Sequence, residues 1–173
     1  MTNHTIFLTG ATGFLGAQIA RQILQNQNAR LVVLLRGADV EAARQRLRRE
    51  WWDWPDARET VGGRVQVLAG DITLPRLGLS ENDYSVLARQ VTHVIHAAAD
   101  IRLFAPLEEL RQANVTGTLR VLELAQAVHD DHGLSCFAHV SSAYVAGRRS
   151  GPVAEAELGD RCGVSSPYEQ SKY

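Results

Sequence analysis

The sequence is poor in cysteine and has no marked excess of charge of either sign. Its two cysteines, Cys136 and Cys162, form no spaced framework and no metal-ligand motif. We therefore expect reduced thiols, no metal site and a cytoplasmic location. The formal net charge is -1, so no field of the whole chain attracts nucleic acid or an anionic membrane. No nucleic-acid recognition module is present either.

Long hydrophobic runs are also lacking. No window approaches the ~20 apolar residues of a membrane-spanning helix. The N-terminus has no basic segment followed by a long apolar one, so we expect neither a membrane span nor a signal peptide. The remaining composition, 45% hydrophobic and 21% charged, is that of a soluble globular protein. A chain of 173 residues is long enough for one domain with a full core.

Short apolar runs alternate with helical stretches along the chain. Strands are predicted at 5–8, 31–35, 65–69, 91–97 and 136–140. Helices are predicted at 14–25, 39–52, 80–89 and 107–129, and from Ser166 onward. This alternation predicts an α/β fold of the Rossmann type, a doubly wound parallel sheet with helices on both faces. Because the last helix has barely begun when the chain stops at Tyr173, we expect a fragment whose C-terminal part is missing.

Two helices have an apolar stripe whose inner residues are predicted. The stripe of helix 39–52 contains Val40, Ala43, Leu47 and Trp51. The inner side of helix 107–129 is predicted to hold Leu110, Ala113, Leu119, Leu122 and Ala125. At the end of helix 39–52, the segment Trp51-Trp52-Asp53-Trp54 is expected to pack its aromatic rings on the core; a partner-binding patch is the alternative.

Three glycines stand three residues apart in TGATGFLG, residues 9–16, where the first strand gives way to the first helix. In such a unit Gly10 allows the tight turn, Gly13 lets the backbone approach a pyrophosphate, and Gly16 lets the helix pack closely on the strand. The helix N-terminus adds free N–H groups and the positive end of the helix dipole. The segment predicts a dinucleotide site, with a tight turn that binds nothing as the alternative.

Residues at the ends of later strands also suit a dinucleotide. Arg36 ends the second strand, where an arginine fits the 2′-phosphate of NADP, although a solvated strand end is the alternative. Asp71 and Ile72 follow the third strand and are placed to meet the adenine. The small side chains of 97–99 let a cofactor lie against the sheet edge. We expect His96 to be packed or hydrogen-bonded rather than catalytic.

A reacting group is predicted near the C-terminus. Tyr168 and Lys172 are four residues apart on the last helix, so they share a face. A neighbouring ammonium and a positively charged nicotinamide favour phenolate, which makes Tyr168 a general acid for carbonyl reduction. Ser142 ends the fifth strand, and its hydroxyl would hold the substrate oxygen. Tyr-x-x-x-Lys pairs are common by chance, so this pair gains weight only from its context.

The motifs TGATGFLG, GDI, HAAA, NVTGT, VSSAYVAG and YEQSK occur in the order and spacing of the extended short-chain dehydrogenase/reductases. The resemblance covers essentially the whole chain and implies that Ser142, Tyr168 and Lys172 are catalytic. Ser142 is preferred to Ser141 because the family's Ser or Thr lies three residues before the Val of its Val-x-Gly ending, here Val145. Asn114 would help to order a water and the lysine. The cofactor-binding residues expected from the motifs and strand ends are Gly10, Thr12, Gly13, Phe14, Leu15, Gly16, Arg36, Asp71, Ile72, Ala97, Ala98, Ala99, Tyr168 and Lys172.

A narrower resemblance exists to the thioester-reductase and fatty-acyl-reductase branch, also called the male-sterility type. It rests on LLRGADVEAARQRLRREWW, LAGDITLPRLGLS, VIHAAADI and HVSSAYVAG. Members use NADPH to reduce an acyl thioester, on a carrier protein or coenzyme A, to an aldehyde or alcohol. The resemblance implies a preference for NADP(H) over NAD(H), with residues 1–173 as the NAD(P)-binding domain. Many members carry Thr at the position of Ser142, and members continue into a C-terminal substrate domain.

Other interpretations stay open. A sugar epimerase or dehydratase, or a hydroxysteroid-type dehydrogenase, belongs to the same family, although Arg36 argues against the sugar enzymes, which mostly prefer NAD. A non-catalytic nucleotide-binding protein is the alternative from another class. The arginines of 44–49 are expected to form a solvated face rather than a site for phosphopantetheine or an acidic carrier protein. The segment 129–132 is expected to be a solvated helix end rather than a metal site. The fifth strand is expected to be an exposed edge through which two copies associate.

Overall fold

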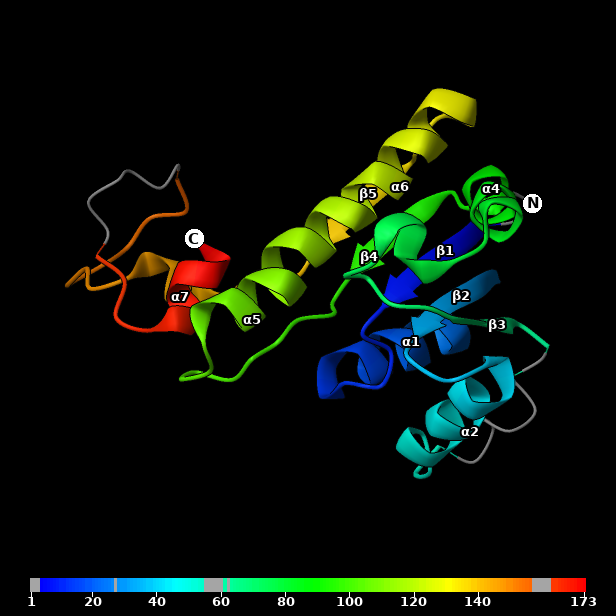
Figure 1. Cartoon of the computed structure of the whole chain (residues 1–173), viewed down its shortest axis with the longest axis horizontal. Coiled ribbons are helices and arrows are strands. Elements are labelled where there is room, and N and C mark those ends of the chain that lie inside the picture. Colours follow the sequence, from blue (N-terminus) through cyan, green and yellow to red (C-terminus); the bar gives the residue numbers. More distant parts are fainter. Residues whose placement is uncertain (1–3, 27, 55–60, 62, 157–162) are drawn as a thin grey trace.

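A parallel sheet forms the centre of the computed structural model, which describes residues 4–26, 28–54, 61, 63–156 and 163–173. Cys162 lies outside these residues. Within them the sheet has five strands in the order β3-β2-β1-β4-β5, all paired in parallel (Figure 1). The strands are β1 (His4–Thr9), β2 (Ala29–Leu35), β3 (Val65–Ala69), β4 (His93–His96) and β5 (Cys136–His139). This order confirms the predicted Rossmann-type sheet, because the chain winds outward from β1 in both directions.

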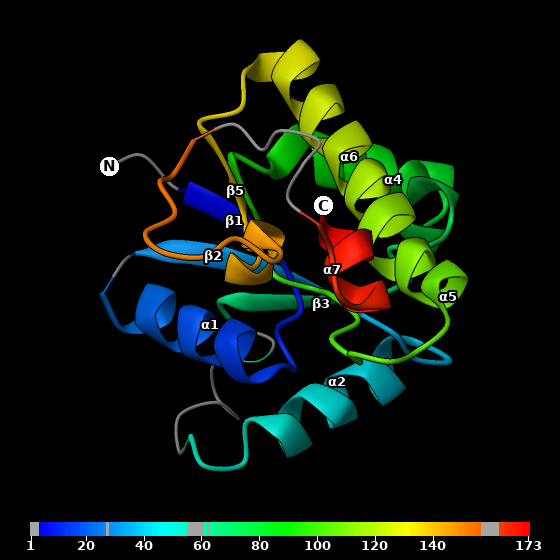
Figure 2. The same cartoon turned by 90° about the vertical axis from the view of Figure 1, so that its left-hand side faces the viewer.

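Helices cover both faces of the sheet, as predicted (Figure 2). The helices α1 (Phe14–Asn26) and α2 (Val40–Glu50) cover one face, and α4 (Glu81–Gln90) and α6 (Gly117–His132) cover the other. The shorter elements are the 3-10 turns η1 (Pro75–Gly78) and η3 (Ala143–Ala146), α5 (Leu107–Arg111), the π-helical segment η2 (Gln112–Thr116) and α7 (Pro167–Lys172). No helix in the described residues combines the length and hydropathy needed to cross a membrane.

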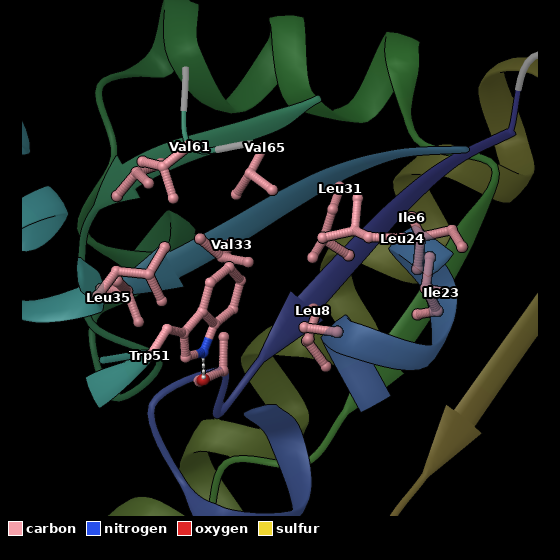
Figure 3. Packing of buried hydrophobic residues seen from close by; sticks show 14 of the residues in the cluster. Ile6, Leu8, Ile23, Leu24, Leu31, Val33, Leu35, Trp51, Val61 and Val65 are labelled. Atoms are coloured by element: carbon pink, nitrogen blue, oxygen red, sulfur yellow. Dashed lines mark hydrogen bonds between the residues drawn. The ribbon is translucent and has the colours of Figure 1, made fainter. Parts of the chain in front are cut away.

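Alternation along β1 divides the core into two layers. Ile6 and Leu8 pack against α1 and α2, whereas Phe7 between them packs against α4 and α6. The layer on the α1 side includes Ile23 and Leu24 of α1 and Trp51 at the end of α2 (Figure 3). Because both faces are buried, the central strands are apolar along nearly their whole length, as the run in β2 predicted.

The helix starts follow the predicted capping residues. Asp39 accepts a hydrogen bond from Ala42 N at 2.8 Å, and Ser80 accepts one from Asp83 N at 3.1 Å. Ser166 accepts one from Glu169 N at 3.2 Å, with a proline in the first turn of α7. Each side-chain oxygen satisfies a backbone N–H that has no partner within its helix.

The prediction of one long regular helix at 107–129 was wrong in two respects. The segment divides into α5, η2 and α6. Leu119 and Leu122, predicted on the inner side, are exposed, and the buried stripe of α6 instead contains Gly117, Val121, Leu124, Ala125 and Val128. The physical reason is that the true stripe passes through Asn114 and Gly117, which carry no apolar signal. Gly117 lets the helix approach Ile72 closely, because a Cβ at this position would lie 2.7 Å from Cδ1 of Ile72 and would require that side chain to shift.

The end of α2 also differs in part from the prediction. Ala43, Leu47 and Trp51 of the predicted stripe are buried, whereas Val40 is exposed. The expected packing of the aromatic segment is confirmed for Trp51 and Trp54, which lie in the core layer on the α1 side.

Candidate functional site

The glycine-rich segment forms a tight turn between β1 and α1. Gly10 has φ +78°, and its carbonyl accepts a hydrogen bond from Gly13 N at 2.9 Å. A Cβ on Gly10 would lie 2.6 Å from the carbonyl carbon of Ala97, and a Cβ on Gly16 would lie 2.1 Å from the Gly10 oxygen. The turn therefore requires glycine at 10 for its conformation and at 16 for the close approach of α1.

A cavity of about 610 Å³ opens beside this turn, at the carboxyl ends of β1 to β4. Ligands of open α/β folds bind at this edge. The cavity brings together nine of the predicted cofactor residues, which are Gly10, Thr12, Gly13, Arg36, Asp71, Ile72, Ala97, Ala98 and Ala99. Phe14, Leu15 and Gly16 do not line it. Phe14 is 89% exposed, and Gly16 is buried where α1 meets the turn.

Two arginines meet at one side of the cavity. Arg46 of α2 donates from Nη1 to the backbone oxygen of Arg36, at 3.4 Å, and both residues line the cavity. Within the predicted solvated face of 44–49, Arg46 thus reaches the edge of the cavity, whereas Arg44 and Arg48 pair with exposed Glu41 at 3.8 and 3.7 Å. No charge pattern in the sequence separates Arg46 from its neighbours, because the difference arises from where α2 meets the end of β2.

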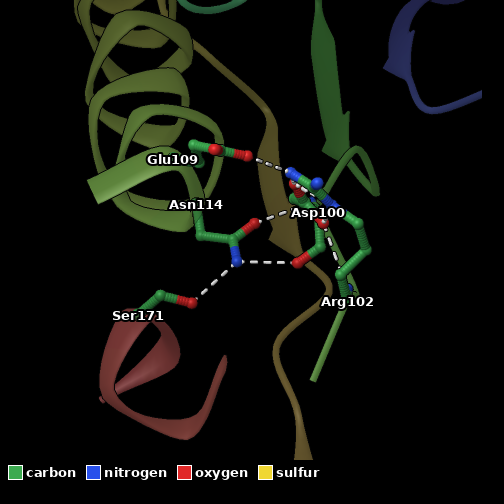
Figure 4. A network of polar contacts seen from close by, with 5 residues as sticks. All are labelled: Asp100, Arg102, Glu109, Asn114 and Ser171. Carbon is green, nitrogen blue, oxygen red and sulfur yellow. Dashed lines mark hydrogen bonds and ion pairs between the residues drawn. The ribbon is translucent and has the colours of Figure 1, made fainter. Parts of the chain in front are cut away.

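Asn114 joins the cavity wall to α7 (Figure 4). Its Oδ1 accepts from Asp100 N at 2.8 Å, and its Nδ2 donates to Asp100 O at 2.9 Å and to Ser171 Oγ at 2.8 Å. Ser171 in turn donates to the backbone oxygen of Tyr168, at 2.7 Å. Asn114 is buried within the π-helical segment η2, a distortion that is frequent at functional sites. Ser171 carried no signal in the sequence, whereas the position of Asn114 in the NVTGT motif did.

The wall of the cavity beside Asn114 carries an ion-pair network. Arg102 binds Asp100 Oδ2 at 2.6 Å and Glu109 Oε2 at 2.8 Å. The hydrogen bond from Arg102 lowers the pKa of Asp100, so this carboxyl stays ionised. The network ties the segment after β4, which lines the cavity, to the first turn of α5.

Ser142, Tyr168 and Lys172 lie beyond the residues that line the cavity. Ser142 caps η3 and accepts from Tyr144 N at 3.2 Å, and the Tyr144 ring meets the buried Tyr168 ring edge-on at 6.3 Å. This ring contact places η3, which Ser142 caps, beside α7, which carries Tyr168. Burial lowers the pKa of Lys172. The positive charge of Lys172 also lowers the pKa of His96 and of His139, in addition to the larger effect of burial on each ring.

His96 is packed and hydrogen-bonded, as predicted. Its side chain is fully buried, with Nδ1 2.7 Å from Thr9 Oγ1 and Nε2 3.0 Å from Thr118 Oγ1. The ring stacks on His139 at 5.2 Å between centroids. Burial, with smaller contributions from His139 and Lys172, lowers the pKa of His96 to about 4. The imidazole is therefore neutral at physiological pH. Its two contacts join the end of β4 to Thr9 of β1 and Thr118 of α6.

The glycine turn, the parallel sheet and the cavity at its carboxyl edge define an NAD(P)-binding domain of the Rossmann class. The chain belongs to the NAD-binding family described as "Male sterility protein", whose model matches residues 8–173. This membership confirms the resemblance to the male-sterility branch.

Individual relatives agree with this family. The chain is 34% identical over 185 residues to the L-2-aminoadipate reductase large subunit of Penicillium chrysogenum, covering 98% of this chain and 13% of that protein. It is also 34% identical over 181 residues to D-lysergyl-peptide-synthetase subunit 3 of Claviceps purpurea (strain 20.1), covering 98% of this chain and 9% of that protein.

Solved structures show the same relationship. The terminal R domain from the myxalamid PKS-NRPS biosynthetic pathway matches with a TM-score of 0.86 and 30% identity, over 99% of this chain and 44% of that one. The reductase domain of a non-ribosomal peptide synthetase from Mycobacterium tuberculosis matches with a TM-score of 0.77 and 30% identity, over 98% of this chain and 42% of that one. The chain thus spans less than half the length of each of these reductase domains.

Proposed function

We propose that this chain is the cofactor-binding part of an NADPH-dependent oxidoreductase that reduces an acyl thioester, held on a carrier protein or coenzyme A, to an aldehyde or alcohol. The observation that carries the cofactor proposal is the meeting of Arg36 and Arg46 in the cavity beside the glycine turn. The substrate class is supported by the similar structures, one of which is a reductase domain of a non-ribosomal peptide synthetase and another the terminal R domain of a PKS-NRPS pathway.

The lining of the cavity fits each part of the dinucleotide. The backbone of the turn around Gly13 is the place for the pyrophosphate, next to the first N–H groups of α1. Arg36 and Arg46 offer charged donors for a 2′-phosphate, whereas a carboxylate would suit a free 2′-hydroxyl. Ile72 presents an apolar side chain to the adenine. The small side chains of 97–99 leave room for the rest of the cofactor along the sheet edge.

The side chains of η3 and α7 supply the remaining chemistry. The bound cofactor provides a hydride for the thioester carbonyl carbon. In this proposal the Tyr168 hydroxyl donates a proton to the carbonyl oxygen as it gains charge, and the Ser142 hydroxyl holds that oxygen by a hydrogen bond. The hemithioacetal that results breaks its carbon–sulfur bond and releases the thiol of the carrier or of coenzyme A, which leaves the aldehyde. Reduction of the aldehyde to the alcohol would require a second molecule of NADPH. Lys172 is four residues further along the same helix, and its ammonium stabilises the phenolate that Tyr168 becomes after it donates its proton. The bond from Asn114 to Ser171 fixes the helix that carries both residues.

The test uses the protein at its natural full length, with NADPH oxidation followed on acyl-coenzyme A and on acyl-carrier protein. We expect turnover with an acyl thioester. We also expect Tyr168→Phe to lower kcat by about 100-fold or more, the usual range for losing a general acid. Tyr84→Phe on α4 is the matched control and should retain activity. Turnover of nucleotide sugars in place of thioesters, or full activity of Tyr168→Phe, would contradict the proposal.

A further inference from the structure

Trp51 connects the end of α2 to the glycine turn. Its indole Nε1 donates a hydrogen bond to the backbone oxygen of Ala11, at 2.9 Å and across 40 positions of sequence (Figure 3). Trp51 is 2% exposed and Ala11 is fully buried. A buried carbonyl needs a partner, and the indole N–H supplies one.

The orientation of the Ala11 carbonyl also sets the direction of the N–H group in the same peptide unit. The peptide unit between Ala11 and Thr12 is planar, and its C=O and N–H groups point in opposite directions when it is trans. No cis peptide bond occurs among the described residues. The Ala11 oxygen points inward to Trp51, so the Thr12 N–H is turned the other way, and Thr12 lines the cavity. Trp51 therefore acts on a backbone donor of the turn without touching the cavity itself.

Trp51 also belongs to a cluster of side chains at the end of α2. Its ring lies 5.0 Å from the ring of Trp54, and the Arg21 guanidinium of α1 stacks over Trp54 at 5.5 Å. Arg21 also pairs with Asp53 at 3.4 Å. The residues 51–54 are thus fastened to α1, the helix that the turn opens. Because Trp51 follows α2, the same segment also joins the turn to the helix that places Arg46 in the cavity.

From these contacts we infer that Trp51 is a positioning residue for the cofactor's pyrophosphate. Its indole N–H fixes the peptide that presents the Thr12 N–H, and this is separate from its contribution to the core. The inference rests on the proposed dinucleotide binding at the turn. It predicts a loss of affinity confined to ligands that carry a phosphate at the turn, because the arginine pair reads the 2′-phosphate independently.

The experiment compares Trp51→Phe with Trp54→Phe in the full-length protein. Trp51→Phe keeps an aromatic ring and removes the N–H, whereas Trp54→Phe alters the same cluster without touching the turn. For Trp51→Phe we expect the Kd and KM of NADPH to rise about fivefold, the equivalent of one ordinary hydrogen bond. We expect kcat at saturating NADPH to stay unchanged, and the Kd of adenosine 2′-phosphate, which has no pyrophosphate, to stay unchanged as well. Trp54→Phe should lower Tm while leaving the Kd of NADPH at its wild-type value.

The outcomes separate this inference from the proposed function. If the wild-type protein binds no pyridine nucleotide, the proposed function fails. If the wild type binds NADPH and Trp51→Phe binds it equally well, or loses adenosine 2′-phosphate to the same degree, the positioning role is wrong. Should Trp51→Phe fail to fold, ¹⁵N-tryptophan spectra of the wild type decide the matter. The Trp51 indole N–H signal should shift on adding NADP⁺ and that of Trp52, which is 82% exposed, should not. An unmoved Trp51 signal would overturn the inference.

Discussion

A chain of hydroxyl and imidazole groups links Thr9, at the end of β1, through His96 and Thr118 to the backbone of Asn114. Thr118 Oγ1 donates to Asn114 O at 2.7 Å, so it accepts from His96 Nε2–H. Thr9 Oγ1 accepts from Ala98 N at 3.2 Å, and its own proton is directed to His96 Nδ1, which is the acceptor of a neutral ring protonated on Nε2. A neutral imidazole protonated on Nε2 makes both contacts and accepts the Thr9 hydroxyl proton, whereas a protonated ring would leave that hydroxyl proton without this acceptor.

This arrangement predicts a loss of stability in acid. The pKa of His96 is about 4 in the folded protein and about 6.5 in an unfolded chain. Between these values the unfolded state binds the extra proton, so the free energy of unfolding falls as pH drops from about 6.5 to about 4, by at most ~3 kcal/mol. His139, which stacks on the ring, and the positive charge of Lys172 oppose its protonation in the same sense. Urea denaturation at several pH values should show a shallower decline in His96→Gln than in the wild type. His129→Gln on the exposed end of α6 is the control, and an unchanged decline in His96→Gln would contradict the assignment.

The two arginines of the cavity predict cofactor selectivity. Arg36→Ala or Arg46→Ala should each weaken NADPH binding by about 10- to 100-fold, the range for a hydrogen bond to a charged group. Binding of NADH should change little, because it lacks the 2′-phosphate. Calorimetric titration of both nucleotides measures this, with Arg48→Ala, which removes an exposed partner of Glu41, as the control. Equal losses for NADPH and NADH would show that the arginines do not read the 2′-phosphate.

At the residue scale, motifs reveal some members of the site and tertiary packing supplies others. The glycines, Arg36 and residues 97–99 lie at the ends of strands. The alternation of strands and helices in the sequence was therefore enough to predict that these residues share one edge of the sheet. The contacts that bring Arg46, Ser171 and Trp51 to the site became visible only in the structure. Each residue acts through a contact across 10 or more positions, and neither propensity nor local spacing carries that information.

At the scale of elements, the junction of β1 and α1 separates the demands of folding from those of binding. A Cβ on Gly16 would meet the Gly10 oxygen at 2.1 Å, whereas a Cβ on Gly13, which lines the cavity, would meet the same oxygen at 3.3 Å and no other atom within 4 Å. We therefore expect Gly16→Ala to displace α1, lower Tm and abolish nucleotide binding. Gly13→Ala should keep most of the stability and still lose binding. Thermal unfolding and nucleotide titration of both variants test this. Wild-type binding by Gly16→Ala would contradict the close approach.

The elements themselves were predicted well where apolar periodicity is strong and poorly where a polar residue belongs to the inner stripe. The limits of β3 and the caps at Asp39, Ser80 and Ser166 agree with the sequence patterns. The π-helical segment was missed, because no residue type encodes an extra residue in a turn. It turns Asn114 inward, where its amide binds Asp100 and Ser171. The departure from regular helix therefore coincides with the position of Asn114, a residue of the candidate site.

At the scale of the whole molecule, β5 is an edge of the sheet in the part of the chain described, since it pairs with β4 alone. A shallow cavity of about 460 Å³ adjoins it, lined mostly by apolar side chains of β1, α1, β4 and β5. An unpaired edge beside an apolar surface favours pairing with another strand.

We therefore expect residues 1–173, produced alone, to associate with rising concentration. Sedimentation equilibrium under reducing conditions measures this, because Cys136 on β5 is an exposed free thiol. Cys136→Lys should weaken association by placing a charge on the edge, while Cys136→Ser should not. A monomer at every concentration would show that the edge does not pair between copies.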